Sequence, residues 1–154
     1  MLVLSLLGCG VKKKIENKIG EAIGEKIIEG ATGQKVDVEG DKVTVKGEDG
    51  SKLTLGGGEW PDNDLIKNIP VFKNGKIESV MSNEQSMVMF IESVEQQDFE
   101  KYMESIKTSF PEDAFEMNSD EVISYGGTNG SIQVQLTYEI ENKTLGIVVA
   151  EASE

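Results

Sequence analysis

The sequence contains no arginine and no histidine, so all 15 of its basic residues are lysines. Lysine lacks the planar guanidinium group that binds phosphates and carboxylates through two parallel hydrogen bonds. The formal net charge is −13, because 28 acidic residues oppose those lysines. A field of this sign repels the phosphate backbone of nucleic acids. The composition therefore excludes nucleic acid as an expected partner.

Cysteine occurs once, at Cys9, so the chain cannot form an internal disulfide. The usual ligand sets for structural or catalytic zinc are missing as well, because they need several cysteine or histidine side chains. Proline is scarce, with three residues, whereas glycine is frequent, with 17. In a chain of 154 residues this balance predicts one modest globular domain with many turns and a looser extension.

The single cysteine ends a short apolar run that begins at Met1, and a lysine triplet follows at residues 12–14. A small residue, Gly8, stands directly before Cys9, which is the order of types in a bacterial lipoprotein signal. We therefore predict that residues 1–8 are a signal peptide, that cleavage occurs between Gly8 and Cys9, and that the Cys9 thiol carries a lipid. The run is too short for a spanning helix, which needs about 20 apolar residues. Because a secretory signal carries a basic segment before its apolar run, the signal is interpreted as truncated, with its true start upstream.

Residues 9–34 are predicted to form a lipid-proximal helix or stalk. Isoleucine recurs every four residues, and glycines within the segment weaken a helix by about 1 kcal/mol each. The repeated residues are Ile15, Ile19, Ile23 and Ile27. The pattern leaves three arrangements open: the helix lies on the membrane, packs on a partner or on the following strands, or serves as a stalk.

Residues 35–58 show strict alternation in three short segments, 35–39, 42–46 and 51–55, separated by glycine-containing turns. Alternation with this spacing predicts a three-stranded β-meander that is apolar on one face. That face comprises Val36, Val38, Val43, Val45, Leu53 and Leu55. The triple glycine at 56–58 is interpreted as a hinge.

Residues 59–154 are predicted to form an acidic α+β domain. The apolar run at 87–91 predicts a central strand that is buried on both faces. Apolar spacing over 95–109 predicts a helix with one buried side. Further strands are expected at 76–82, 121–125, 131–139 and 144–150, with a short pairing strand at 115–118. The predicted fold class is α+β: an N-terminal helix and three-stranded meander, followed by an antiparallel sheet covered on one face by a single helix.

Several short motifs occur in a fixed order along the chain: the lipobox cysteine Cys9, the sequence Ala31-Thr32-Gly33, a Val-Asp-Val segment, Trp60-Pro61, and Asp98-Phe99-Glu100. Pro70 and Gly75-Lys76-Ile77 stand between the last two. In these features the chain resembles a family of small uncharacterised lipoproteins from mainly Gram-positive bacteria, whose shared region is a domain of unknown function. The resemblance implies an exported, lipid-anchored α+β protein and assigns no catalytic or binding residue.

Three groups of residues could form a chemical site. An acid/base pair could come from the carboxylates Glu112, Asp113, Glu116, Asp120 and Glu121, but their polar surroundings favour a solvated face. Asp62-Asn63-Asp64 has the start of a calcium loop, yet lysines occupy the sixth and twelfth positions, where glycine and glutamate belong. The methionines Met81, Met87, Met89, Met103 and Met117 could bind Cu(I) but are interpreted as core residues.

Trp60 could stack on a ligand, although a plug at the edge of the sheet is the favoured interpretation. The glycine-rich stretch 126–130 joins two predicted strands and opens no helix, so it is interpreted as a hairpin loop and not as a phosphate cradle. Serine and lysine at Ser105 and Lys107 lack the spacing of a known nucleophile motif. We therefore predict no catalytic residue, no metal and no cofactor.

The expected function is a non-enzymatic binding or interaction module, anchored by lipid to the extracytoplasmic face of the cell membrane. Its partner could be an envelope protein, a polymer or a small ligand. Two alternatives stay open: an inhibitor or exclusion lipoprotein that blocks one envelope protein, and a hydrolase that uses a carboxylate pair.

Overall fold

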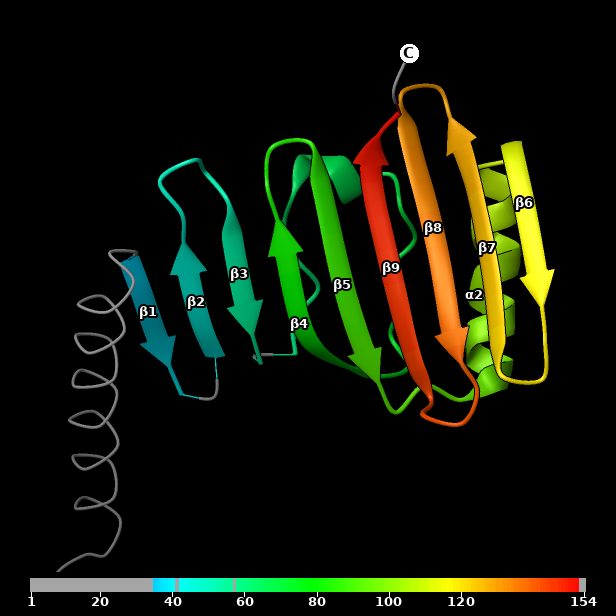
Figure 1. The fold of residues 1–154 in the computed structure, drawn as a ribbon, viewed down its shortest axis with the longest axis horizontal. Coiled ribbons are helices and arrows are strands. Elements are labelled where there is room, and N and C mark those ends of the chain that lie inside the picture. The colour runs from blue at the N-terminus through cyan, green and yellow to red at the C-terminus, as the bar shows by residue number, and fades with distance from the viewer. Residues whose placement is uncertain (1–34, 41, 57, 153–154) are drawn as a thin grey trace, which may run out of the picture.

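A computed structural model describes residues 35–40, 42–56 and 58–152 as one antiparallel sheet of nine strands with a single α-helix (Figure 1). The strands are β1 (Lys35–Glu39), β2 (Lys42–Lys46), β3 (Lys52–Leu55), β4 (Lys76–Ser82), β5 (Ser86–Glu92), β6 (Glu112–Asn118), β7 (Val122–Asn129), β8 (Ile132–Glu139) and β9 (Thr144–Glu151). The helix is α2 (Gln96–Ser109), and a short 3₁₀ helix, η1 (Asp64–Ile66), precedes β4.

The order of strands across the sheet is β1-β2-β3-β4-β5-β9-β8-β7-β6. The first five strands therefore form one meander. The chain then runs through α2 to the opposite edge and returns through β6, β7 and β8, so that β9 pairs with β5 in the middle of the sheet. Each of the neighbouring pairs is antiparallel.

The predicted fold class is wrong, because the structure is mostly one nine-stranded antiparallel sheet with one helix. The meander is no separate unit: β3 pairs with β4, with Leu53 opposite Met81. Gly56 ends β3, but its amide still donates to the carbonyl of Glu78 at 2.6 Å. Pairing with β4 satisfies backbone groups that an edge strand would leave open, so the sheet continues past the glycines. The predicted lipid-proximal helix or stalk at 9–34 lies outside the described residues.

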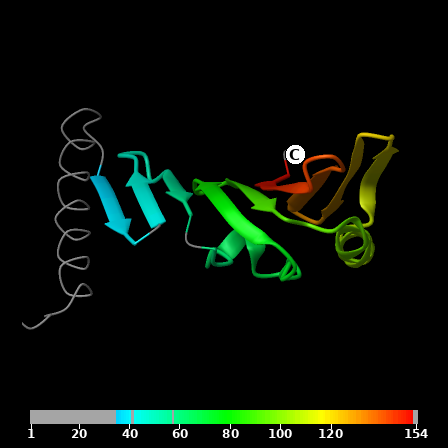
Figure 2. The same ribbon diagram turned by 90° about the horizontal axis from the view of Figure 1, so that it is seen from below.

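The core lies on one face of this sheet, beneath α2 and the segment that contains η1, which occupy the same side (Figure 2). Every second residue of a strand points to that side, which in β5 places Met87, Met89 and Ile91 in the core. From α2, Phe99 stacks on Tyr138 of β8 with a centroid separation of 4.7 Å. We call this side of the sheet the covered face and the other side the open face.

Helix α2 matches the predicted range of 95–109 to within one residue. Its buried residues are Phe99, Tyr102, Met103 and Ile106, the spacing of one helix face. The amide of Phe110 still donates to the carbonyl of Ile106 at 2.8 Å, and Pro111 follows, which cannot continue the hydrogen-bond ladder. The helix prediction is confirmed.

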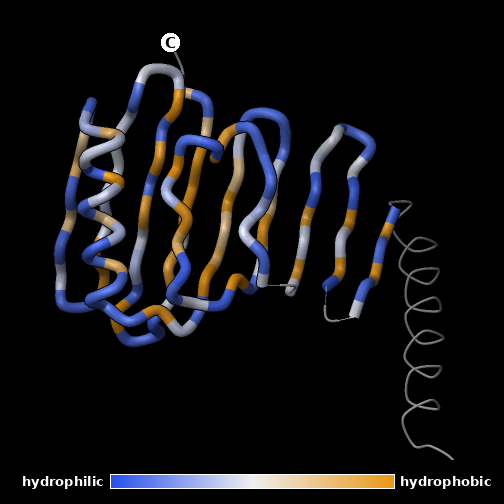
Figure 3. Tube along the Cα trace, turned by 180° about the vertical axis from the view of Figure 1, so that it is seen from behind, coloured by the Kyte–Doolittle hydropathy of each residue, from blue (hydrophilic) through white to orange (hydrophobic). Residues whose placement is uncertain are grey.

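Two predictions for the strands are wrong. In β5, Met87, Met89 and Ile91 are buried but Phe90 is 41% exposed, so the strand is buried on one face only. Residues 126–129 belong to β7 and pair with β8, and the turn begins only at Gly130. Coloured by hydropathy, the central strands show apolar residues alternating with polar ones, and α2 lies towards the β6–β7 end of the sheet (Figure 3).

Candidate functional site

The predicted lipid-attachment site, Gly8 and Cys9, lies outside the described residues. Among the residues that the structure describes, no helix is long and apolar enough to cross a membrane. Within the same residues, no group of three His, Cys, Asp or Glu side chains could hold a metal ion.

The stretch Asp62-Asn63-Asp64 caps a helix and does not form a cation loop. The Asn63 side chain accepts a hydrogen bond from the amide of Leu65 at 2.8 Å, as an N-cap residue does. Asp64 forms an ion pair with Lys67. The hydrogen bond from Lys67 lowers the pKa of the Asp64 carboxyl, with a smaller contribution from the Lys67 charge. These polar groups therefore have partners within the chain.

The five carboxylates considered for acid/base chemistry lie on β6 and in the turn that follows it. Glu112, Asp113, Glu116, Asp120 and Glu121 are exposed. Glu116 accepts a hydrogen bond from Lys107 of α2 at 2.9 Å, and Glu104 accepts another from the same lysine. The hydrogen bonds from Glu104 and then Glu116 raise the pKa of Lys107. A general acid needs a desolvated carboxyl, and these exposed side chains do not supply one.

The methionines separate into two groups. Met87, Met89 and Met103 are buried in the core, as predicted. Met81 and Met117 are instead about half exposed, at 52% and 53%, and both belong to the open face. The interpretation of all five as core residues is therefore wrong for these two.

Trp60 is half-buried and packs against the core. It lines a cleft of about 330 Å³ between the segment before η1 and strands β2 to β5, together with Lys42, Thr54 and Val80. Lys42 also lies 3.8 Å from Glu59. Basic and acidic groups thus meet at this cleft, and their charges give it no preference for a ligand of either sign.

The most unusual surface of the molecule is the open face. Strand pairing aligns two neighbouring rows of residues that each take one residue from every strand. The first row is Val36, Val45, Leu53, Met81, Val88, Val148, Gln135, Gly126 and Phe115, of which Val36 is buried. The second row is Val38, Val43, Leu55, Ser79, Phe90, Gly146, Thr137, Ser124 and Met117. We call these two rows the neutral band.

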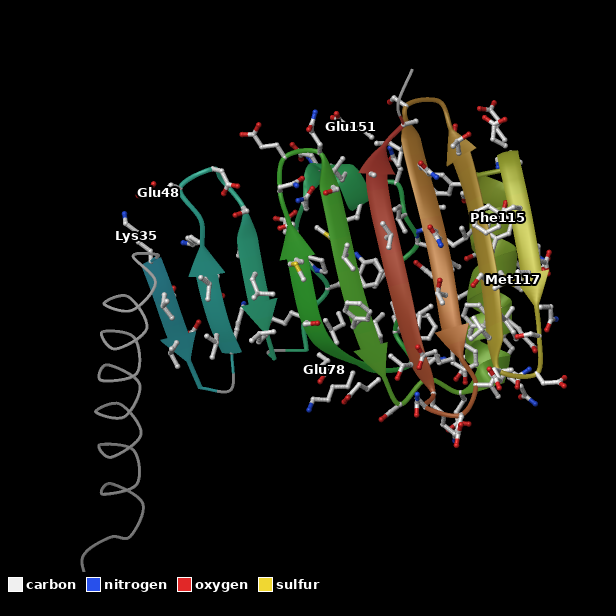
Figure 4. The ribbon with its side chains drawn as sticks, in the orientation of Figure 1. Lys35, Glu48, Glu78, Phe115, Met117 and Glu151 are labelled. Atoms are coloured by element: carbon white, nitrogen blue, oxygen red, sulfur yellow. The ribbon has the colours of Figure 1, made fainter. Side chains whose placement is uncertain are left out.

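The neutral band contains no ionisable side chain, although 28% of the chain is charged. It also carries six of the seven large hydrophobic side chains that are exposed among the described residues. These are Leu55, Met81, Phe90, Phe115, Met117 and Val148. Phe115 and Met117 lie on β6, on the side of the sheet away from α2 (Figure 4). Monomeric proteins rarely leave large contiguous apolar patches in water, and such patches mark contact surfaces.

The open face is not flat where β3 meets β4. A depression of about 280 Å³ opens between the β2–β3 and β4–β5 hairpins, and its apolar lining is Val45, Leu53, Met81 and Val88. All four residues belong to the first row of the neutral band. The neutral band therefore contains a depression as well as exposed apolar area, and a partner's side chains could fill that depression.

This face was not among the predicted sites, although the sequence contains a pattern that indicates it. In the run 87–91 every residue is apolar, so a strand with one covered face must leave Val88 and Phe90 on the other. Phe115 and Met117 alternate with Ala114 and Glu116 in the same manner. The sequence pattern does not give the strand register, and it is the register that aligns these residues with the apolar face of β2 and β3.

Comparison with known proteins found no matching family model, curated protein or solved structure. The resemblance to small Gram-positive lipoproteins therefore stays a prediction.

Proposed function

We propose that this protein is a lipid-anchored, non-enzymatic binding module of a bacterial cell envelope, and that it binds through the open face of its sheet. The observation that carries the proposal is the neutral band, which gathers six exposed apolar side chains in rows free of charge. Burial of such an apolar area against a partner stabilises the complex by about 25 cal/mol for each Å² removed from water.

The anchor is proposed from the sequence. The apolar run that stops at Gly8-Cys9 supports cleavage before Cys9 and attachment of diacylglycerol to its sulfur through a thioether. The lysine triplet that follows would lie near anionic headgroups, where each basic residue contributes about 1 kcal/mol. The strongly acidic residues beyond 59 would be repelled from the same surface, so the sheet would project outward.

The carboxylate hydrolase is not supported by the geometry, because the acidic side chains considered for it are exposed and lie on an edge strand. An inhibitory or exclusion role fits the same binding face and differs only in the partner.

The anchoring is tested in the native host with the gene expressed from its own upstream sequence. We expect labelled palmitate to be incorporated into the wild-type protein and not into a Cys9→Ser variant. Globomycin should cause a slower-migrating precursor to accumulate, and Cys9→Ser should move the protein from the membrane to the soluble fraction. Absence of label together with unchanged fractionation would overturn the anchoring.

A further inference from the structure

We propose that the partner of the open face is a second copy of this chain. This inference rests on the binding role proposed above and names its partner. The contact surface is the part of the neutral band on β2 to β5 and β9, which we call the apolar patch. Its large side chains are Val43, Val45, Leu53, Leu55, Met81, Val88, Phe90 and Val148.

Charge is the first argument for a second copy. Each chain carries a net charge of −13, so two copies repel one another over most approaches. The apolar patch lacks ionisable groups, so two copies that meet there bring no like charges into direct contact. A basic partner would form ion pairs with the acidic residues elsewhere on the surface. It could form none with the apolar patch. A neutral apolar surface fits the patch best, and the chain itself presents one.

Dimensions give the second argument. Strands lie about 4.8 Å apart and residues on one face repeat every ~6.8 Å, so five strands and two rows span roughly 24 Å by 14 Å. This is about 340 Å² in plan, somewhat less than half of the about 800 Å² that each partner of a standard interface buries, so a surrounding polar rim must supply the rest. Gln135 and Thr137 continue the rows beyond Val148 and Gly146 and supply such a rim.

Symmetry gives the third argument. In a two-fold dimer the same patch serves both partners, so it must be complementary to itself. Two sheets pack face to face at about 10 Å when both inner faces are apolar, and their side chains interdigitate. The depression beside Leu53 and Met81 can receive a protruding side chain from the other copy, and the unbranched methionine adapts to an irregular gap.

A solution experiment on non-acylated protein separates this inference from the anchoring. The full chain with Cys9→Ser is studied by sedimentation equilibrium from about 1 to about 300 μM, a range that brackets a micromolar dissociation constant. We expect a reversible monomer–dimer equilibrium. Because the contact is apolar and the repulsion is electrostatic, raising NaCl from about 0.05 to about 0.5 M should strengthen the dimer several-fold.

A matched pair of variants locates the contact. Met81→Asp places a charge in the patch and should raise the dimer dissociation constant by about tenfold or more. Met117→Asp is the control: Met117 lies on the same face and is 53% exposed against 52% for Met81, but it lies outside the patch on β6. We expect it to change the constant less than about twofold. Circular dichroism confirms that both variants fold.

A strictly monomeric chain over this concentration range would overturn the inference. So would equal weakening by both variants, which places the contact elsewhere, or weakening of the dimer by salt, which indicates a charged interface. None of these results affects the anchoring, which is measured by lipid label and fractionation. Conversely, loss of the anchoring leaves this equilibrium in solution unchanged, so the two proposals fail independently.

Discussion

The two faces of the one sheet follow opposite patterns. On the covered face a typical row is Asp37, Thr44, Thr54, Val80, Met89, Ile147, Leu136, Tyr125 and Glu116. That row is apolar only in the middle, beneath α2 and the segment around η1, and polar at both ends. On the open face the neutral band is mostly apolar from β2 through the middle strands β5 and β9, and its polar residues Gln135, Thr137 and Ser124 lie on β8 and β7.

This difference shows which apolar residues the fold itself requires. On the covered face, apolar side chains stop where the cover stops. On the open face, Leu53 and Leu55 of β3 are apolar although the described residues provide no layer above them. Polar residues at these positions would keep the same strands and the same core. The apolar side chains of β3 on the neutral band are therefore better explained by a contact with another molecule than by folding.

The largest expected difference in stability between the two faces is between substitutions of two phenylalanines. Phe99 on the covered side is 0% exposed and Phe90 on the open face is 41% exposed. We expect Phe99→Ala to lower the free energy of unfolding by about 3–5 kcal/mol, because it removes a buried ring and leaves a cavity. Phe90→Ala should lower it by about 1 kcal/mol or less. Urea unfolding of dilute, monomeric protein measures both, and equal losses would mean that the faces do not differ.

A smaller effect is expected from two glycines that face opposite sides. A Cβ added to Gly127 would overlap the carbonyl oxygen of Phe110, which is backbone and cannot move aside easily. A Cβ added to Gly146 would meet the ring of Phe90 at 3.6 Å and the carbonyl oxygen of Thr137 at 3.8 Å, which are ordinary contacts. We therefore expect Gly127→Ala to destabilise the protein by about 1–3 kcal/mol and Gly146→Ala to leave stability within about 0.5 kcal/mol. Thermal unfolding of both variants measures the difference.

Local patterns predicted most of the elements but not the way they join. Alternation located β1, β2, β3, β4 and β8, and the 3.6-residue repeat located α2, because these signals depend on neighbours in sequence. The glycine stretch at 56–58 was interpreted as a hinge, since glycine interrupts a strand. Whether β3 then pairs with β4 is decided by backbone groups more than twenty residues apart, which no local pattern records.

The candidate binding face was hidden for a related reason. The apolar face of β2 and β3 was predicted, but a cover for it was expected, because three strands need one to be stable alone. In the structure these strands are supported by pairing of β3 with β4, and Leu55 on their apolar face is 44% exposed. Phe115 and Met117 belong to a strand predicted to be only four residues long, so their alignment with that face could not be inferred.

The smallest effect concerns pH, and it again separates the two faces. All three tyrosines point to the covered side, where their hydroxyls donate to backbone carbonyls: Tyr102 to Pro70, Tyr125 to Phe110 and Tyr138 to Val94. Burial raises the pKa of each tyrosine, most strongly that of Tyr102. The two rows of the neutral band contain no titratable side chain and should add no pH dependence.

The sign follows from linkage. A raised pKa means that the folded state holds the phenolic proton more tightly than the unfolded state, in which tyrosine titrates near pH 10. The stabilisation is therefore complete below about pH 10 and is lost as the pH rises through the raised pKa of the folded state. Each tyrosine should lower the free energy of unfolding by about 1.4 kcal/mol per pH unit while only the unfolded form ionises.

Urea unfolding between about pH 9 and about pH 11 tests this slope. Lysines titrate in the same pH range. The compared variants keep every lysine, so the contribution of the lysines to the slope is the same in each. Tyr102→Phe should reduce the slope by an amount that rises with pH and approaches about 1.4 kcal/mol per pH unit near pH 11, where the unfolded tyrosine is almost fully ionised, and absorbance of tyrosinate should show one late-titrating group fewer. Phe90→Ala, on the open face, should leave the slope unchanged. An unaltered slope in Tyr102→Phe would show that its hydroxyl ionises as readily in the folded protein as in the unfolded chain, contrary to its burial beneath Pro70.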